Sequence, residues 1–387
     1  MLTTPGKATA VAGTGFIGPV HVEALRRLGR PIAGVLGSSL EKGQRAAQQL
    51  GLPRAYATFA ELLADPDVGT VHIASPNRHH FEQSQAAIVA GKHVICEKPL
   101  AMNMRESAEL MTLAKPQTAV TAVCYNIRFY PLCLEARQRI PAGELGELYH
   151  ASGSYMQDWL LKQTDFNWRL LAEDGGALRA VADIGTHWLD LVQFITGLNV
   201  CEVCADLKTV WPTRLRPAGG VETFAGRPAG LADSPRGLQP VNVTTEDYGS
   251  VLLRFGGGAR GCCTLSQVTA GRKNCLRFEI AGSKGSLAWN SERPNELWLG
   301  HRGRANEVLI RDLPQLHASV QRFSNYPGGH NEGFPDTFKQ LFRAIYAAID
   351  GDSTMSYPSF VDGHREIAIC DAVLRSDCEH RWVNVEL

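Results

Sequence analysis

The chain has 387 residues with 39 Lys+Arg against 39 Asp+Glu, so its formal net charge is zero and no basic run indicates a nucleic-acid partner. No apolar run approaches the roughly 20 residues of a membrane helix, and the first seven residues are too short and polar for a signal peptide. The length predicts about two domains, and ten scattered cysteines predict reduced thiols in the cytoplasm rather than a disulfide framework.

A glycine-rich turn follows the first predicted strand, residues 8–12, and precedes a predicted helix over 19–28. Its sequence is Gly13-Thr14-Gly15-Phe16-Ile17-Gly18. Gly13 permits the tight turn, Gly15 lets backbone approach a pyrophosphate, and Gly18 allows close helix–strand packing. The helix N-terminus offers free N–H groups to the phosphates. In this strand–turn–helix context the motif predicts dinucleotide binding, with an ordinary glycine-rich turn as the alternative.

The second predicted strand, residues 31–36, ends without the acidic residue that usually holds the ribose 2′-hydroxyl of NAD. Gly37, Ser38 and Ser39 stand there instead, with Lys42 and Arg45 close behind. Hydroxyl groups near cations can accept a 2′-phosphate, so the turn favours NADP(H) slightly over NAD(H). Solvated charges on the next helix are an equally good interpretation.

Two more predicted strands end in polar residues. Residues 68–74 are followed by Ser75, Asn77 and His80, which we expect to contact the ribose or nicotinamide, and then by a helix over 81–90. The apolar run 94–96 is followed by Glu97-Lys98-Pro99. Strands alternating with helices predict a parallel, doubly wound sheet, and such sheets bind ligands beyond the carboxyl ends of their strands. Lys98 is therefore expected to point at the ligand, although most Lys-Pro pairs are surface features.

Taken together, the turns at 13–18, 75–80 and 97–99 resemble the glucose–fructose oxidoreductase / inositol dehydrogenase / rhizopine-catabolism (Gfo/Idh/MocA) family. Residues 125–131, which include Asn126, fit its next segment. The resemblance implies an α/β protein. Residues 1–124 would form an NAD(P)-binding Rossmann domain, to which Glu97, Lys98 and Asn126 contribute. Residues 125–387 would form an α+β domain for substrate binding and oligomerisation, with a large, mostly antiparallel open sheet.

The second predicted domain carries a polar and aromatic loop after the strand 148–156. Asp165, Trp168 and Arg169 suit a sugar ring, because apolar CH faces stack on aromatic rings while hydroxyls form hydrogen bonds. Tyr155 and His330, the latter in a glycine-rich loop, are further substrate candidates. Aromatic residues at the rim of a core and an exposed loop histidine are the structural alternatives.

From Asp183 the pattern is helical. An apolar stripe of this helix lies beside a polar one, on which Asp183 and His187 are one turn apart. A histidine is a natural proton acceptor for alcohol oxidation, and Asp183 is placed to influence its orientation and basicity. A helix N-terminal carboxylate with a satisfied core histidine would show the same pattern. The family resemblance implies that Lys98, Asp183 and His187 are the catalytic set. We expect no metal ion at the site.

The rest of the chain is predicted to be mostly strands, followed by helices over 334–350 and 361–376 and a strand at 382–385. The closing helix and strand are expected to pack back on the first units. A Pro/Gly-rich stretch, 217–240, suggests a lid or an oligomer arm. The open face of the sheet is the expected interface of a homodimer or homotetramer. The lone CxxC, Cys201 and Cys204, has no second pair to complete a zinc site.

The resulting hypothesis is an NAD(P)-dependent oxidoreductase that transfers hydride between the nicotinamide and a secondary alcohol of a sugar, glycoside or cyclitol. His187 or Lys98 would accept the hydroxyl proton, and the sequence does not rank them. Two alternatives use the same fold: glycoside hydrolysis through transient oxidation, and non-catalytic NAD(P)-sensing regulation of sugar genes. Retention of all three catalytic residues argues against the regulator.

Overall fold

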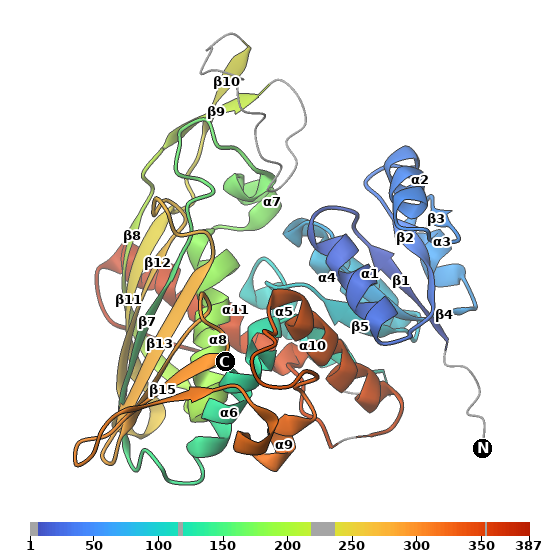
Figure 1. The fold of residues 1–387 in the computed structure, drawn as a ribbon. Helices are drawn as coiled ribbons and strands as arrows, with labels where there is room; N and C mark the ends of the chain where they lie inside the picture. Colours follow the sequence, from blue (N-terminus) through green and yellow to red (C-terminus); the bar gives the residue numbers. More distant parts are fainter. Residues whose placement is uncertain (1–6, 115–118, 218–236, 353) are drawn as a thin grey trace.

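The computed structural model describes residues 7–114, 119–217, 237–352 and 354–387, and it contains two large sheets with helices between and around them (Figure 1). The first sheet is parallel, with the order β3-β2-β1-β4-β5-β6. Its strands are β1 (Ala8–Ala12), β2 (Ile32–Leu36), β3 (Ala55–Tyr56), β4 (Val68–Ile73), β5 (His93–Cys96) and β6 (Thr121–Val123). The order reverses at β1, and such a switch point opens a crevice at the carboxyl ends of the strands.

Helices connect these strands: α1 (Ile17–Arg27), α2 (Leu40–Gln49), α3 (Phe59–Ala64), α4 (His80–Val89) and α5 (Met104–Ala114). Val94, Ile95 and Cys96 of β5 are fully buried, as expected for a parallel strand covered on both faces. The predicted doubly wound parallel unit is therefore confirmed.

The second sheet has nine strands in the order β16-β15-β14-β13-β7-β12-β11-β8-β17. They are β7 (Leu148–Met156), β8 (Val200–Lys208), β11 (Tyr248–Phe255), β12 (Arg260–Ser266), β13 (Cys275–Gly282), β14 (Ser286–Asn290), β15 (Glu296–Gly300), β16 (Glu307–Ile310) and β17 (Val383–Asn384). Only the β7–β12 pair in this sheet is parallel. The predicted large, mostly antiparallel sheet is confirmed; β16 was not predicted.

Helices cover one face of this sheet, and the other face is open in Figure 1. The helices that follow the first domain are α6 (Pro131–Arg139), α7 (Ala172–Gly175), α8 (Thr186–Thr196), α9 (Ala318–Gln321), α10 (Phe334–Ile349) and α11 (Phe360–Glu379). The apolar stripe predicted for α8 packs against β7 and β13, and its residues Trp188, Leu191 and Ile195 are buried. Helix α8 is thereby fixed to the large sheet.

The end of the chain joins both sheets. Helix α10 packs on α1, and α11 contacts α5, β6 and β8. Strand β17 pairs with β8, so the last strand extends the large sheet instead of packing on the parallel one. The stretch 217–240 falls mostly outside the described residues. Its flanks form a separate hairpin, in which β9 (Thr213–Pro217) pairs with β10 (Leu238–Asn242).

Candidate active site

The glycine-rich turn lies at the carboxyl end of β1. Gly13 has φ +116°, and a Cβ built there would come within 2.2 Å of the Ala74 carbonyl oxygen. A Cβ on Gly18 would meet the carbonyl oxygen of Gly13 at 2.1 Å. Around Gly15, by contrast, the space is open to 4 Å. Two glycines are therefore required by the fold, while Gly15 leaves room for a ligand before the first turn of α1, which begins at Ile17 beside the half-exposed Phe16.

Some of the polar side chains at and after the turn that follows β2 already have partners within the protein. The Ser39 hydroxyl caps α2 by accepting the Lys42 N–H at 3.3 Å. Arg45 is paired with Glu41 at 2.8 Å on the exposed face of the same helix. Ser38 and Lys42 are exposed.

The turns after β4 and β5 are tied together by a buried histidine. The ring nitrogens of His80 lie 2.7 Å from the Pro99 carbonyl oxygen and 2.9 Å from that of Ser75. The Ser75 hydroxyl donates to Gln83 at 2.7 Å. His80 therefore holds the loop around Lys98 in place, and its side chain is not open to a ligand. Asn77 donates to the carbonyl of Gly175 at 2.9 Å, which joins the two halves of the chain across the crevice.

Lys98 and Asp183 meet across that crevice. The Lys98 ammonium donates to the Asp183 carboxylate at 2.7 Å and to the Asp183 carbonyl at 2.8 Å. Arg169 lies 3.4 Å from the same carboxylate and stacks on Trp168 with 4.4 Å between the guanidinium carbon and the ring centre. Burial by itself raises the pKa of Asp183, but the charges of Lys98 and Arg169 and the Lys98 hydrogen bond outweigh it and lower that pKa well below its ordinary value. Asp183 is therefore an anion.

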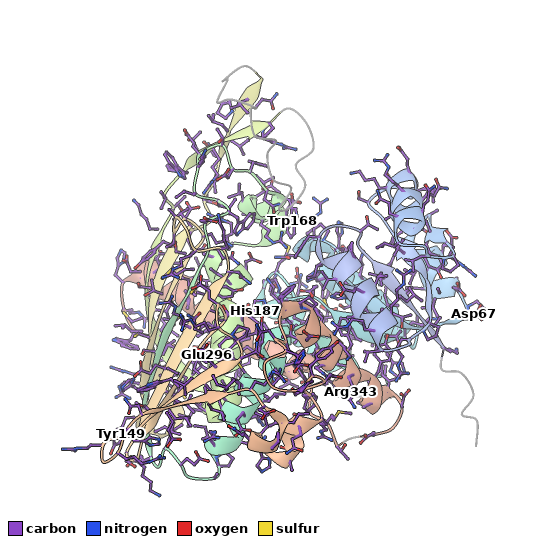
Figure 2. The ribbon with its side chains drawn as sticks, in the orientation of Figure 1. Asp67, Tyr149, Trp168, His187, Glu296 and Arg343 are labelled. Atoms are coloured by element: carbon purple, nitrogen blue, oxygen red, sulfur yellow. The ribbon has the colours of Figure 1, made fainter. Side chains whose placement is uncertain are left out.

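His187 lies beside this pair, in the space between the large sheet and the helices of the parallel domain, with Trp168 toward α7 (Figure 2). Burial and the positive charge of Lys98 lower the pKa of His187 to about 3, so the imidazole is neutral. Its Nδ1 is buried and has no hydrogen-bond partner among the described residues. The Tyr125 and Tyr155 rings flank it, with centroids 5.8 Å and 6.4 Å away. A neutral imidazole has one unprotonated ring nitrogen and can therefore accept a proton.

Contrary to the prediction from the sequence, Asp183 and His187 do not lie on one regular α-helix. Residues Val181–Gly185 form a π-helical turn, and α8 starts only at Thr186. The Asp183 carboxylate is directed to Lys98, and among the described residues no hydrogen bond joins it to His187. It acts on His187 through its charge, which partly offsets the lowering of the His187 pKa by burial.

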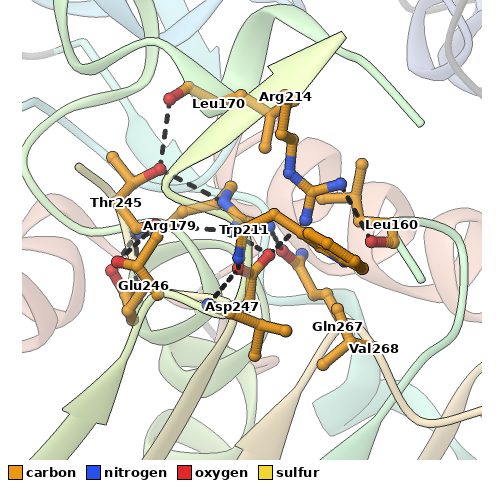
Figure 3. A network of polar contacts seen from close by, with 12 residues as sticks. Leu160, Leu170, Arg179, Trp211, Arg214, Thr245, Glu246, Asp247, Gln267 and Val268 are labelled. Atoms are coloured by element: carbon orange, nitrogen blue, oxygen red, sulfur yellow. Dashed lines mark hydrogen bonds and ion pairs between the residues drawn. The ribbon is translucent and has the colours of Figure 1, made fainter. Parts of the chain in front are cut away.

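Figure 3 shows a buried polar network around Arg179 and Asp247, and its member Gln267 also binds Asp183. Gln267 donates to the second Asp183 oxygen at 2.8 Å, and its own amide oxygen accepts from Arg179 at 2.9 Å. Arg179 is paired with Asp247, which also pairs with Arg214 of β9; all three are fully buried or nearly so. Sequence analysis missed these residues. Asp247 follows Thr244, Thr245 and Glu246 in the sequence, so no local pattern marked it as buried.

Glu246 fixes the start of the π-helical turn. Its carboxylate accepts the backbone N–H groups of Arg179 at 2.9 Å and of Val181 at 2.8 Å. These donors belong to the first turn, which has no partners of its own within the helix. Glu246 thus fixes the backbone just before Asp183, and Gln267 fixes the Asp183 carboxylate.

The other predicted residues lie at different distances from this centre. Tyr155 is buried, donates to Asn274 at 2.6 Å and reaches the His187 ring. The Asp165 carboxylate accepts the N–H of Lys162 within its own loop at 2.7 Å. His330 is exposed, and its Nδ1 is 3.4 Å from the carbonyl oxygen of Gly328 in the same loop. Asn126 is buried and donates to Thr337 at 2.7 Å. Asp165 and His330 are therefore not brought to His187 by any described contact.

One buried group of described residues has donor atoms that suit a metal ion: His21, Glu97 and Cys124, all within 4.8 Å of one another. His21 and Glu97 already share a hydrogen bond of 3.0 Å. We therefore assign these side chains to hydrogen bonding. No helix among the described residues is long and apolar enough to cross a membrane.

Comparison with known proteins places this arrangement in a family. Residues 7–125 match the model of an oxidoreductase family with an NAD-binding Rossmann fold, and residues 133–288 match the GFO/IDH/MocA C-terminal domain. Levoglucosan dehydrogenase of Pseudarthrobacter phenanthrenivorans is 30% identical over 385 residues, which cover 96% of each chain.

Solved structures agree in fold. Levoglucosan dehydrogenase in complex with NADH and levoglucosan superposes with a TM-score of 0.87 at 28% identity, covering 98% of this chain and all of that one. An inositol dehydrogenase homologue of Azotobacter vinelandii, in complex with NADH and myo-inositol, gives 0.83 at 25% identity and 98% coverage of each chain.

Proposed function

Since this chain belongs to the GFO/IDH/MocA family of NAD-binding oxidoreductases, we propose that it transfers hydride between NAD(H) and a secondary alcohol of a sugar or cyclitol. The observation that carries the proposal is the Lys98–Asp183 ion pair beside the neutral imidazole of His187, whose Nδ1 has no hydrogen-bond partner among the described residues. The similar proteins whose structures contain NADH together with levoglucosan or myo-inositol support the substrate class.

The geometry supports distinct roles for the three residues. His187 is neutral, and we assign it the hydroxyl proton. The Lys98 ammonium is held by the Asp183 carboxylate at 2.7 Å, so it suits the stabilisation of the developing alkoxide. Asp183 holds Lys98 in place. The nicotinamide supplies the hydride acceptor.

The substrate would lie between the loop after β5 and the large sheet. Arg169 lies beside Asp183, Tyr155 lies beside His187, and Trp168 stacks on Arg169; these three residues are our substrate contacts. Asp165 and His330 remain weaker candidates, since their side chains are engaged within their own loops or exposed. The cofactor contacts that we propose lie at the turns 13–18 and 37–39 and at Ser75, Asn77, Glu97, Lys98 and Asn126. The His80 side chain, which was also expected to contact the cofactor, is engaged by the Ser75 and Pro99 carbonyls instead.

The choice between NAD(H) and NADP(H) is a finer proposal. Exposed Ser38 and Lys42 support a 2′-phosphate, as the sequence suggested. Glu41, which is paired with Arg45, opposes it, because its carboxylate would repel the phosphate. The division at 124/125, a cytoplasmic location and a homo-oligomer formed through the open sheet face also stand as proposals.

A dinucleotide titration followed by a substrate panel tests the function. Intrinsic fluorescence would compare NAD(H) with NADP(H), and absorbance of reduced nicotinamide would then follow sugars, anhydrosugars, cyclitols and glycosides. Substrate-dependent reduction of the cofactor is the expected result. Release of a leaving group from a glycoside without net cofactor reduction would identify the hydrolase instead, and dinucleotide binding without turnover of any substrate would favour the regulator.

A further inference from the structure

A row of buried, hydrogen-bonded side chains leads away from the candidate site. Glu97 Oε1 lies 3.0 Å from His21 Nε2, and His21 Nδ1 lies 3.0 Å from His72 Nδ1. His72 Nε2 lies 3.1 Å from the Tyr346 hydroxyl, which also bonds the hydroxyl of Thr9. These four hydrogen bonds form a continuous chain, and both imidazoles are fully buried.

The row runs across the parallel domain from the carboxyl ends of the central strands toward their amino ends. Glu97 follows the carboxyl end of β5, His72 lies within β4, and Thr9 lies near the start of β1. His21 comes from α1 and Tyr346 from α10, the two helices packed on each other there. Since the strands are parallel, their amino ends all lie on one side of the domain and their carboxyl ends on the other, so the two ends of the row lie on opposite sides of the domain.

The far end opens on a cavity of about 320 Å³. Tyr346 and Thr70 line it together with the charged or titratable residues Lys7, Arg30, Lys92, His93 and Asp350. The Arg30 guanidinium lies 4.6 Å from the centre of the Tyr346 ring and pairs with Asp350. A cavity with so many polar partners can hold water, so a proton that reaches Tyr346 has somewhere to go.

The near end borders the candidate catalytic residues. Glu97 Oε2 accepts the backbone N–H of Lys98 at 3.2 Å. The Glu97 charge also acts on His187, whose pKa it raises against the effect of burial and of Lys98. The thiol of Cys124 lies beside the same carboxylate.

The hydrogen bonds have one consistent direction when Glu97 is ionised. A carboxylate only accepts, so His21 donates from Nε2 and its Nδ1 accepts from His72. The Nε2 of His72 then accepts from the Tyr346 hydroxyl. Every member between the carboxylate and the cavity can both donate and accept, which is what stepwise proton transfer requires. A tie between α1, β4 and α10 would need hydrogen bonds but not this succession of titratable groups.

We propose that Glu97, His21, His72 and Tyr346 form a proton relay between the candidate active site and the cavity at the amino ends of the strands. The relay rests on the proposed dehydrogenase function. It lets a proton leave or enter while cofactor and substrate occupy the crevice.

The transfer is balanced for reduction of one carbonyl group, which is the direction that the resting tautomers allow. The carbonyl carbon takes hydride from the reduced nicotinamide, and its oxygen takes one proton that arrives along the row. Cavity water gives a proton to Tyr346, Tyr346 gives one to Nε2 of His72, His72 gives its Nδ1 proton to His21, and His21 gives its Nε2 proton to Glu97. Glu97 passes one proton through a water molecule to His187 and so to the carbonyl oxygen, and it is an anion again at the end. The pass leaves the protons on Nδ1 of His21 and on Nε2 of His72. Oxidation of an alcohol runs the same steps backwards and restores the resting tautomers.

The variant Tyr346→Phe tests the relay with the smallest change, because it removes one hydroxyl and keeps the ring. Stopped-flow absorbance would follow hydride transfer, and a pH indicator would follow proton release. We expect turnover and proton release to fall on the order of 100-fold, with KM and dinucleotide affinity unchanged. The solvent deuterium isotope effect on kcat should rise, because proton transfer becomes rate-limiting; a structural role would not raise it. His72→Phe should behave alike.

The matched control is His364→Phe, which removes another buried histidine, bonded to Ser107 at 2.8 Å and outside the row. It should keep the wild-type isotope effect. Folded Tyr346→Phe and His72→Phe enzymes with wild-type proton release and isotope effect would overturn the relay.

A measurement without turnover separates the relay from the proposed function. Nitrogen-15 NMR of the histidines should show the proton of His21 on Nε2 and that of His72 on Nδ1. If no substrate turns over, the proposed function fails, while this result still decides the relay. Other tautomers, or one equivalent of bound metal lost in Cys124→Ser, would overturn it, because the relay atoms would then be otherwise engaged.

Discussion

Gln267 donates a hydrogen bond of 2.8 Å to the Asp183 oxygen that does not face Lys98. Its amide cannot turn over without losing Arg179, which donates to the other end of the amide at 2.9 Å. The Asp183 carboxylate is thus held between the Lys98 ammonium and the Gln267 amide. The geometry of the Lys98 ammonium therefore depends on residues that do not touch substrate.

Gln267→Leu should lower kcat by about 100-fold, because a small displacement of Asp183 moves the Lys98 ammonium. Dinucleotide affinity should not change. Steady-state kinetics and a fluorescence titration check both. Gln163→Leu removes a half-buried glutamine that donates to the Thr213 carbonyl away from the site, and it should leave kcat intact. Equal losses in both variants would show that the effect is general destabilisation.

Lys98→Ala and His187→Ala should each reduce turnover by about 100-fold or more, since each removes a group that handles the proton or the alkoxide charge. Dinucleotide binding should stay largely intact. Single-turnover absorbance and fluorescence titration of the same preparations separate the two quantities. Preserved turnover per bound cofactor, with binding lost, would show that these residues only hold the dinucleotide.

The two glycines of the first turn should respond differently to alanine. Gly13→Ala forces a Cβ into the Ala74 carbonyl at a φ of +116°, and we expect a loss of about 1–3 kcal/mol in the free energy of unfolding. Gly15→Ala has open space around it, so the protein should fold normally and lose dinucleotide affinity. Urea denaturation and fluorescence titration measure the pair. Unchanged affinity in a folded Gly15→Ala protein would place the pyrophosphate elsewhere.

The pH profile should reflect the lowered pKa of His187, which is about 3. A lowered pKa keeps the imidazole neutral down to low pH, so it does not begin to lose its proton-accepting form near pH 6.5. We expect kcat/KM to lack an acid limb with a midpoint near 6.5 in the range where the protein is folded. An acid limb at pH 6–7 that disappears in His187→Gln would contradict the burial argument.

Asp247→Ala should be among the most destabilising single changes in the large-sheet domain. It leaves the Arg179 and Arg214 guanidinium groups buried without their shared carboxylate, at a cost of about 3–5 kcal/mol. Asp371→Ala, which breaks an exposed pair with Arg375, should cost about 0.5 kcal/mol or less. Urea denaturation compares them. A stability loss as small as that of the exposed pair would mean that water replaces the carboxylate.

The sequence by itself determined the features that depend on near neighbours. The strand–turn–helix around Gly13, the Glu97-Lys98-Pro99 turn and the apolar stripe of α8 follow from backbone sterics and from residue periodicity within a few turns. These local rules also predicted the parallel sheet, the antiparallel sheet and most strand positions. The family resemblance, and not these local rules, predicted that Lys98, Asp183 and His187 are the catalytic residues.

Only the tertiary structure decided how those residues meet. The Asp183 carboxylate turned to Lys98, 85 residues away, and to Gln267, 84 residues away, whereas the helical pattern suggested His187. The π-helical turn, which shifts Asp183 out of regular α-helical spacing, is held by Glu246 from a distant segment. His21, His72 and Tyr346 looked like ordinary core residues in sequence, because their hydrogen bonds join α1, β4 and α10 only after the chain has folded. Polar contacts between segments far apart in sequence leave no periodic pattern, so no local rule could predict them.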